Sequence, residues 1–81
     1  MKIKVKFFAS YKEALGKDEI DLDFDDHVTV SDLIENLRQN HPKLGNLLET
    51  LVVSVNLEYA EHTTELKDGD EVALLPPVSG G

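Results

Sequence analysis

The last residues of the chain are the part best suited to covalent chemistry. Pro76-Pro77-Val78-Ser79-Gly80-Gly81 carries no charged side chain, whereas 30% of the whole chain is charged. Two prolines favour an extended polyproline conformation, and six extended residues reach about 20 Å. Gly80 and Gly81 have no side chain, so they can enter a narrow channel and present an unhindered terminal carboxylate. This design suits a carboxylate that one enzyme adenylates and another group then attacks.

A frayed chain end is the competing interpretation of the tail, because termini are often disordered and glycine is common there. The position of the tail in the sequence favours a functional role over fraying. The tail directly follows a predicted strand at residues 72–75 and an acidic turn at residues 67–70. The chain also has no cysteine, which removes disulfides, thiolate catalysis and zinc–thiolate sites. If this protein carries sulfur, the sulfur cannot sit on a cysteine side chain.

Other residues that could do chemistry lack the required spacing. His27, His41 and His62 are 14 and 21 residues apart, which is not a metal-ligand spacing. The four serines have no nucleophile-elbow context. Acidic residues in the segment 18–26 alternate with apolar ones, which indicates the outer face of a strand and not a calcium loop. We therefore predict no metal site and no bound cofactor.

Charge and hydropathy exclude several classes of partner. Sixteen acidic and eight basic residues give a formal net charge of −8, and Arg38 is the one arginine. Phosphate binding needs clustered cations, so nucleic acids and anionic membranes are poor partners. The acidity suits either solubility or a basic protein partner. Because no apolar run is long enough to cross a bilayer and residues 1–6 are unlike a signal peptide, we expect a cytoplasmic protein.

Two alternating segments predict the start of the framework that carries the tail. Residues 2–8 and 19–25 alternate apolar and charged side chains, which predicts a half-buried hairpin with Lys and Asp meeting on its outer face. Residues 10–15 between them predict a helical turn that stops at Gly16.

The next segment has the clearest helical signal. Thr29 and Asp32 have the spacing of a capping box. An apolar stripe follows at helical spacing, formed by Val30, Leu33, Ile34 and Leu37. Pro42 ends the pattern, since the residue before a proline avoids the helical region.

The remaining elements complete an α+β chain. We expect a second short helical piece that includes Leu47 and Leu48, then strands at residues 51–55, 57–60 and 72–75. One helix over one face of a mixed sheet of four or five strands, with the first and last strands adjacent and parallel, is a β-grasp (ubiquitin-like) roll. The predicted domain covers residues 1–75 and the tail residues 76–81. The predicted core is Ile3, Val5, Phe7, Ile20, Leu22, Val30, Leu33, Leu37, Val53, Val55, Val72 and Leu74.

Residues 68–81, with the sequence DGDEVALLPPVSGG, resemble the C-terminal signature of the molybdopterin synthase small subunit, the MoaD family. The segments VKFFA at residues 5–9 and VSVN at residues 53–56 fit the same family, so the resemblance extends over the whole chain. It implies a sulfur carrier that is not catalytic alone. A ubiquitin-activating-enzyme-like adenylyltransferase would use ATP to activate the Gly81 carboxylate, and a sulfur donor would convert it to a thiocarboxylate. A large catalytic subunit would then use that sulfur in molybdopterin (molybdenum cofactor) synthesis.

Two other functions share the same tail chemistry. A ubiquitin-like protein modifier of the small archaeal type would be conjugated through Gly81 to lysines. A sulfur carrier of thiamine synthesis would also use Gly81, although its tail usually lacks the Pro-Pro step.

A partner-binding surface is predicted beside the root of the tail. Phe8 is out of phase with the apolar face of its strand, and Leu75 is out of phase with Val72 and Leu74. Both side chains should therefore lie together on the sheet face that the helix leaves open. With them we assign to partner binding the tail residues Pro76, Pro77, Val78 and Ser79.

Overall fold

The computed structural model describes residues 1–77, so the predicted tail residues 78–81 lie outside the described part of the chain. Five strands form one sheet: β1 (Lys2–Phe7), β2 (Glu19–Asp23), β3 (Val52–Val55), β4 (Glu58–Ala60) and β5 (Glu71–Leu75). Their spatial order is β2-β1-β5-β3-β4, with β1 and β5 parallel and each other neighbouring pair antiparallel. The predicted β-grasp roll is confirmed.

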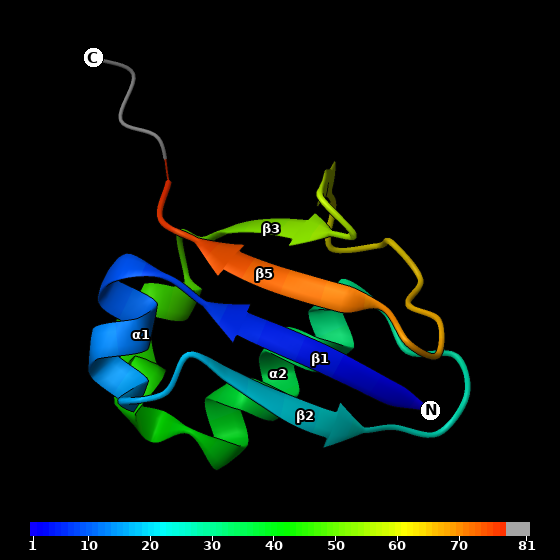
Figure 1. Cartoon of the computed structure of the whole chain (residues 1–81), viewed down its shortest axis with the longest axis horizontal. Coiled ribbons are helices and arrows are strands. Elements are labelled where there is room, and N and C mark those ends of the chain that lie inside the picture. Colours follow the sequence, from blue (N-terminus) through cyan, green and yellow to red (C-terminus); the bar gives the residue numbers. More distant parts are fainter. Residues whose placement is uncertain (78–81) are drawn as a thin grey trace.

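The helices cover one face of this sheet and leave the other open (Figure 1). Helix α2 (Val30–Asn40) crosses behind the strands, while α1 (Ala9–Leu15) and the 3₁₀ helix η1 (Pro42–Leu48) lie together at one end. Gly16, with a φ of 77°, takes the left-handed conformation that closes α1. The predicted stop at this glycine is confirmed.

The capping box of α2 forms as predicted. The Thr29 side-chain oxygen accepts a hydrogen bond from the backbone N–H of Asp32 at 3.3 Å, and the Asp32 carboxylate accepts one from the backbone N–H of Thr29 at 3.0 Å. This reciprocal pair satisfies two donors at the start of the helix. The helix buries the whole predicted stripe, Val30, Leu33, Ile34 and Leu37.

Most of the predicted core is buried, with three corrections. Ile20 and Leu22 are only partly buried because β2 is an edge strand with one neighbour, and Val55 is partly buried where β3 enters its turn. Other buried residues lie outside the prediction: Tyr11 on α1, Leu44 and Leu48 on η1, and Val28 and Leu66 in loops. The small helices α1 and η1 thus contribute more to the core than their lengths suggest.

Strand ends also differ from the prediction by one or two residues. β1 ends at Phe7, because Phe8 is the extended residue that precedes α1. β2 ends at Asp23, β3 begins at Val52 and β4 begins at Glu58. Within residues 1–77, none of the helices is long and apolar enough to span a membrane.

Candidate functional site

The tail leaves the domain from the central strand of the sheet. β5 pairs with β1 on one side and β3 on the other, so both of its edges are hydrogen-bonded. Its entry is also fixed, because the backbone N–H of Gly69 donates to the carbonyl of Lys2 at 2.8 Å and Asp68 accepts from the backbone N–H of Lys2 at 2.7 Å. Pro76 and Pro77 follow the strand and are exposed. The root of the tail is therefore held by a strand that is hydrogen-bonded on both edges and lies at the centre of the sheet.

An apolar surface lies beside this root, on the open face of the sheet. The parallel register ends with Phe7 opposite Leu74. Phe8 directly follows the end of β1, and Leu75 is the last residue of β5, so each is one residue beyond this pair. Phe8 is 44% exposed and Leu75 is partly buried. Antiparallel pairing adds Val52 opposite Leu75, and side chains of directly paired residues share a face. We call Phe8, Val52, Ala73 and Leu75 the tail-root patch.

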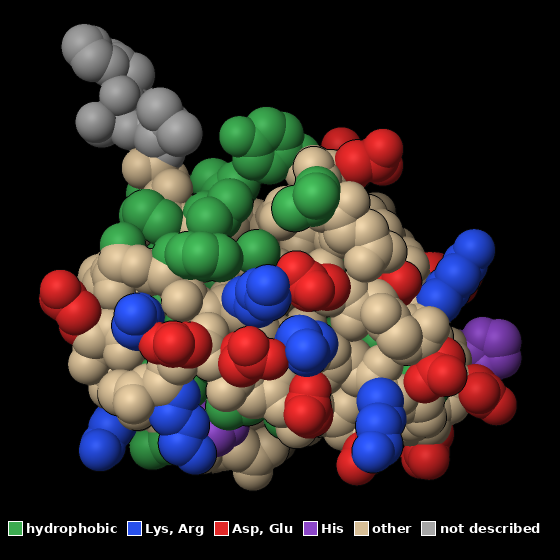
Figure 2. All heavy atoms as spheres, in the orientation of Figure 1, with side chains coloured by type: hydrophobic (Ala, Val, Ile, Leu, Met, Phe, Trp, Pro, Cys, Tyr) green, Lys and Arg blue, Asp and Glu red, His purple; other side chains and the backbone are tan. Residues whose placement is uncertain are grey.

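Figure 2 views the open face, and its hydrophobic side chains gather beside the C-terminal end of β5. The structure thus brings Phe8 and Leu75 to the same region, as their alternation predicts. Their role in docking stays a prediction. The other predicted site residues, Val78, Ser79, Gly80 and Gly81, lie outside the described residues.

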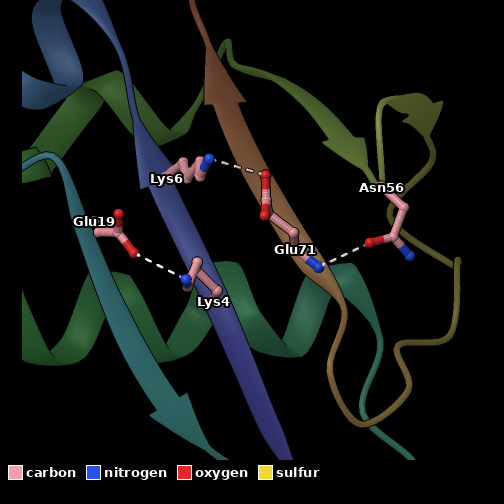
Figure 3. Close-up of polar contacts among 5 residues, drawn as sticks. All are labelled: Lys4, Lys6, Glu19, Asn56 and Glu71. Carbon is pink, nitrogen blue, oxygen red and sulfur yellow. Dashed lines mark hydrogen bonds and ion pairs between the residues drawn. The ribbon is translucent and has the colours of Figure 1, made fainter.

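Ion pairs occupy the part of the open face farther from the tail. Lys4 pairs with Glu19 at 3.3 Å and Lys6 with Glu71 at 3.1 Å (Figure 3). The hydrogen bond and charge of Glu19 raise the pKa of Lys4. The predicted meeting of Lys and Asp across the hairpin is confirmed by the register, which places Lys2 opposite Asp23 and Lys4 opposite Asp21. The Lys4 ammonium group nevertheless forms its ion pair diagonally, with Glu19. This half of the face is solvated and charged, which confines the apolar surface to the tail side.

The β3–β4 hairpin carries a second exposed apolar feature, which sequence reasoning treated only as a weak edge strand. Leu57 is 92% exposed and Tyr59 is 80% exposed. Asn56 holds the turn, since its side-chain amide donates to Asp70 at 2.9 Å and its side-chain oxygen accepts from the backbone N–H of Glu71 at 3.0 Å. The sequence contains a signal for this feature. A two-residue hairpin turn favours Asn-Gly, and leucine stands in this chain where that turn favours glycine.

Two surface hollows flank these features. One hollow, of about 410 Å³, lies beside Phe8. Its lining includes four charged side chains: Lys6 of β1, Lys12 of α1, Asp18 of the following loop and Glu19 of β2. The other, of about 390 Å³, lies under the β3–β4 hairpin. Across residues 1–77, no group of three or more His, Asp or Glu side chains is placed to hold a metal ion.

Comparisons with known proteins match the whole chain. The ThiS family model matches residues 5–81. The molybdopterin synthase sulfur carrier subunit of Chlamydomonas reinhardtii is 40% identical over 83 residues, covering 100% of both chains.

Solved structures give the same picture. SAMP1 of Haloferax volcanii, a small archaeal modifier protein, superimposes with a TM-score of 0.88 at 32% identity, covering 100% of both chains. A chain in the complex of subunits 1 and 2 of molybdopterin-converting factor from Helicobacter pylori superimposes with a TM-score of 0.74 at 27% identity, again covering 100% of both chains. The similarity therefore includes carrier subunits and modifiers with the same fold.

Proposed function

The chain belongs to the ThiS family, and from that premise we propose that it is the sulfur carrier subunit of a molybdopterin synthase, with the Gly81 carboxyl as its working group. The observation that carries the proposal is full-length similarity to molybdopterin synthase sulfur carrier subunits, joined to a Pro-Pro-Val-Ser-Gly-Gly end that leaves the central strand of the sheet.

The chemistry proceeds through an acyl adenylate. An adenylyltransferase attaches AMP from ATP to the Gly81 carboxylate and releases pyrophosphate. A donor then supplies sulfur at the oxidation level of sulfide, which attacks the Gly81 carbonyl carbon and displaces AMP, leaving a thiocarboxylate. In the large subunit, the thiocarboxylate sulfur bonds to a carbon of the pterin precursor. Water then attacks the Gly81 carbonyl carbon, which breaks its bond to sulfur and restores the carboxylate. The chain contributes reach and an unhindered carbonyl, and its partners contribute the catalytic groups.

A large catalytic subunit is the partner that accepts the loaded tail. The similar chain from Helicobacter pylori is found in a complex of subunits 1 and 2 of its converting factor, which supports a two-subunit assembly. The tail-root patch is the docking surface, because a partner that takes up the tail would also bury the partly exposed apolar side chains beside its root. The net charge of −8 favours a basic partner surface.

The free end of Gly81 is the test of this function. Deleting Gly81, or adding one residue after it, should leave the melting temperature unchanged, because the last core residue of the described part of the chain is Leu74. Incubation with the adenylyltransferase and ATP should then give no acyl adenylate by mass spectrometry, whereas the unmodified protein should give one. An extended or shortened protein that still supports molybdopterin synthesis would contradict the proposal.

The docking surface has its own test. Phe8→Ala and Leu75→Ala should each weaken binding to the large subunit by at least about 1 kcal/mol in titration calorimetry, with much smaller changes in thermal stability. Lys2→Ala, at the opposite end of β1, is the matched control and should bind like the unmodified protein. If both patch variants also bind normally, or if both simply unfold, the patch is not the docking site.

A protein modifier is the second candidate, favoured by the close superposition on SAMP1 of Haloferax volcanii. After the same adenylation, a lysine amine would displace AMP and form an isopeptide bond with Gly81. A pull-down with tail-intact protein separates the two functions. A stoichiometric large subunit supports the carrier, and a ladder of lysine conjugates supports the modifier.

A further inference from the structure

The turn between β3 and β4 places an apolar side chain where the backbone favours glycine. Asn56 has a φ of 51° and Leu57 a φ of 72°, both in the left-handed region. Asn tolerates this region, whereas a branched apolar residue is destabilised there. Leu57 gains no burial in compensation, since it is 92% exposed. The free protein thus carries both backbone strain and an exposed leucine at one residue.

The fold itself does not require this leucine. Asn56 fixes the turn through its side-chain bonds to Asp70 and Glu71, and its backbone N–H also donates to the carbonyl of Glu71 at 2.8 Å. Glycine at position 57 would accept the same φ without strain. A residue that costs the free protein stability and contributes nothing to its core is best explained by a contact made with another molecule.

The surroundings of Leu57 define what that molecule presents. Asn56 and Glu58, the chain neighbours of Leu57, line the hollow under the hairpin. Three carboxylates, from Glu58, Glu65 and Asp70, and one ammonium, from Lys67, belong to that lining. This excess of negative charge suits a basic side chain of a partner. The complementary surface therefore combines an apolar pocket for Leu57 with an Arg or Lys beside it.

The β3–β4 hairpin, which carries Leu57 at its turn, and the tail-root patch lie on one connected surface. Tyr59 pairs with Ser54, and Ser54 with Ala73, so a single cross-strand row joins β4 to the patch on β5. At about 3.3 Å per residue, Leu57 lies roughly 15 Å along the sheet from Leu75. A standard interface of about 800 Å² per partner is roughly 30 Å across. One partner can therefore cover both Leu57 and the tail-root patch.

We propose that Leu57 is a second anchor for the large subunit. Its side chain inserts into an apolar pocket of that subunit, and a basic side chain of the subunit, next to the pocket, lies in the acidic hollow under the β3–β4 hairpin of this chain. This inference rests on the proposed function. The anchor would orient the domain while the tail occupies the catalytic channel, because two contacts about 15 Å apart resist rotation better than one.

Leu57→Gly separates binding from folding. In titration calorimetry with the purified large subunit, Leu57→Gly should raise the dissociation constant at least about fivefold, while its melting temperature stays equal to or above that of the unmodified protein. Leu57→Met, which keeps a long apolar side chain, should bind within about twofold of the unmodified protein. A lowered melting temperature for Leu57→Gly would instead assign the leucine to the fold and overturn the proposal.

A charge variant tests the partner's chemistry. Glu65→Lys should weaken binding and reduce its dependence on salt, whereas Glu13→Lys on the exposed face of α1 makes the same charge change away from the hairpin and should have a smaller effect. Normal binding by Leu57→Gly alongside weakened binding by Phe8→Ala would overturn the second anchor and leave the carrier function intact. A Leu57→Gly defect toward the adenylyltransferase alone would refute the large subunit as the occupant. Failure of the unmodified protein to bind the large subunit would refute the proposed function itself.

Discussion

Replacing Asn56 with alanine tests whether the hairpin turn is held by the contacts seen in the structure. The change removes the amide that donates to Asp70 at 2.9 Å and the oxygen that accepts from the backbone N–H of Glu71 at 3.0 Å. It also removes the short polar side chain that lets asparagine tolerate a φ of 51°. The start of β5, and so the strand that carries the tail, loses one of its fixed points.

The magnitude follows from these two bonds. A net hydrogen bond contributes about 0.5–1.5 kcal/mol, and one to a charged group about 1.5–3 kcal/mol. Both bonds of Asn56 are exposed, so the lower ends apply, and their sum is about 2 kcal/mol. For a domain of this size, such a loss lowers the melting temperature by roughly 8–16 °C.

Asn56→Gly is the matched control. Glycine loses both side-chain bonds but accepts the left-handed backbone, so it should be more stable than the alanine variant by about 1 kcal/mol. Urea unfolding at 25 °C, followed by circular dichroism, gives all three free energies. An alanine variant within about 0.5 kcal/mol of the unmodified protein, or one more stable than the glycine variant, would refute this account of the turn.

Three further predictions concern the framework. Phe7→Ala and Leu33→Ala should each lower the free energy of unfolding by roughly 2–5 kcal/mol, since both side chains are buried; little change at both would show that the assigned faces are reversed. Thr29→Ala should cost about 0.5–2 kcal/mol through loss of the helix cap, measured by urea unfolding. Glu19→Gln should bring the pKa of Lys4 down toward 10.5 in an NMR titration. Because a raised lysine pKa adds stability that is present below 10.5 and lost as pH rises through the folded value, the two proteins should converge in stability at higher pH.

Local patterns were sufficient to predict the fold because each of them agrees with the tertiary structure. The alternation of β1 matches a strand buried on one side, and the capping box and stripe of α2 match a helix that lies on that side. The tail chemistry could also be predicted from the sequence, since it depends on the order of residues at one end of the chain and not on contacts between residues distant in the sequence.

Features set by tertiary geometry could not be read in the same way. The register pairs Lys4 with Asp21, but the choice of Glu19 as its ion partner depends on side-chain reach across the sheet. Tyr11 is buried on α1, a helix that packs against both η1 and β5. Leu57 looked like part of a strand, and only its positive φ and its exposure reveal an apolar residue held outside the core.

The most direct test of the carrier function is the mass of the C-terminal peptide. The protein is incubated with the adenylyltransferase, ATP and a sulfur donor, then digested and analysed by tandem mass spectrometry. Our account predicts that one oxygen of the Gly81 carboxyl is replaced by sulfur, and that the large subunit with its pterin precursor reverses this change. An unchanged C-terminal peptide, or sulfur located on any other residue, would contradict it.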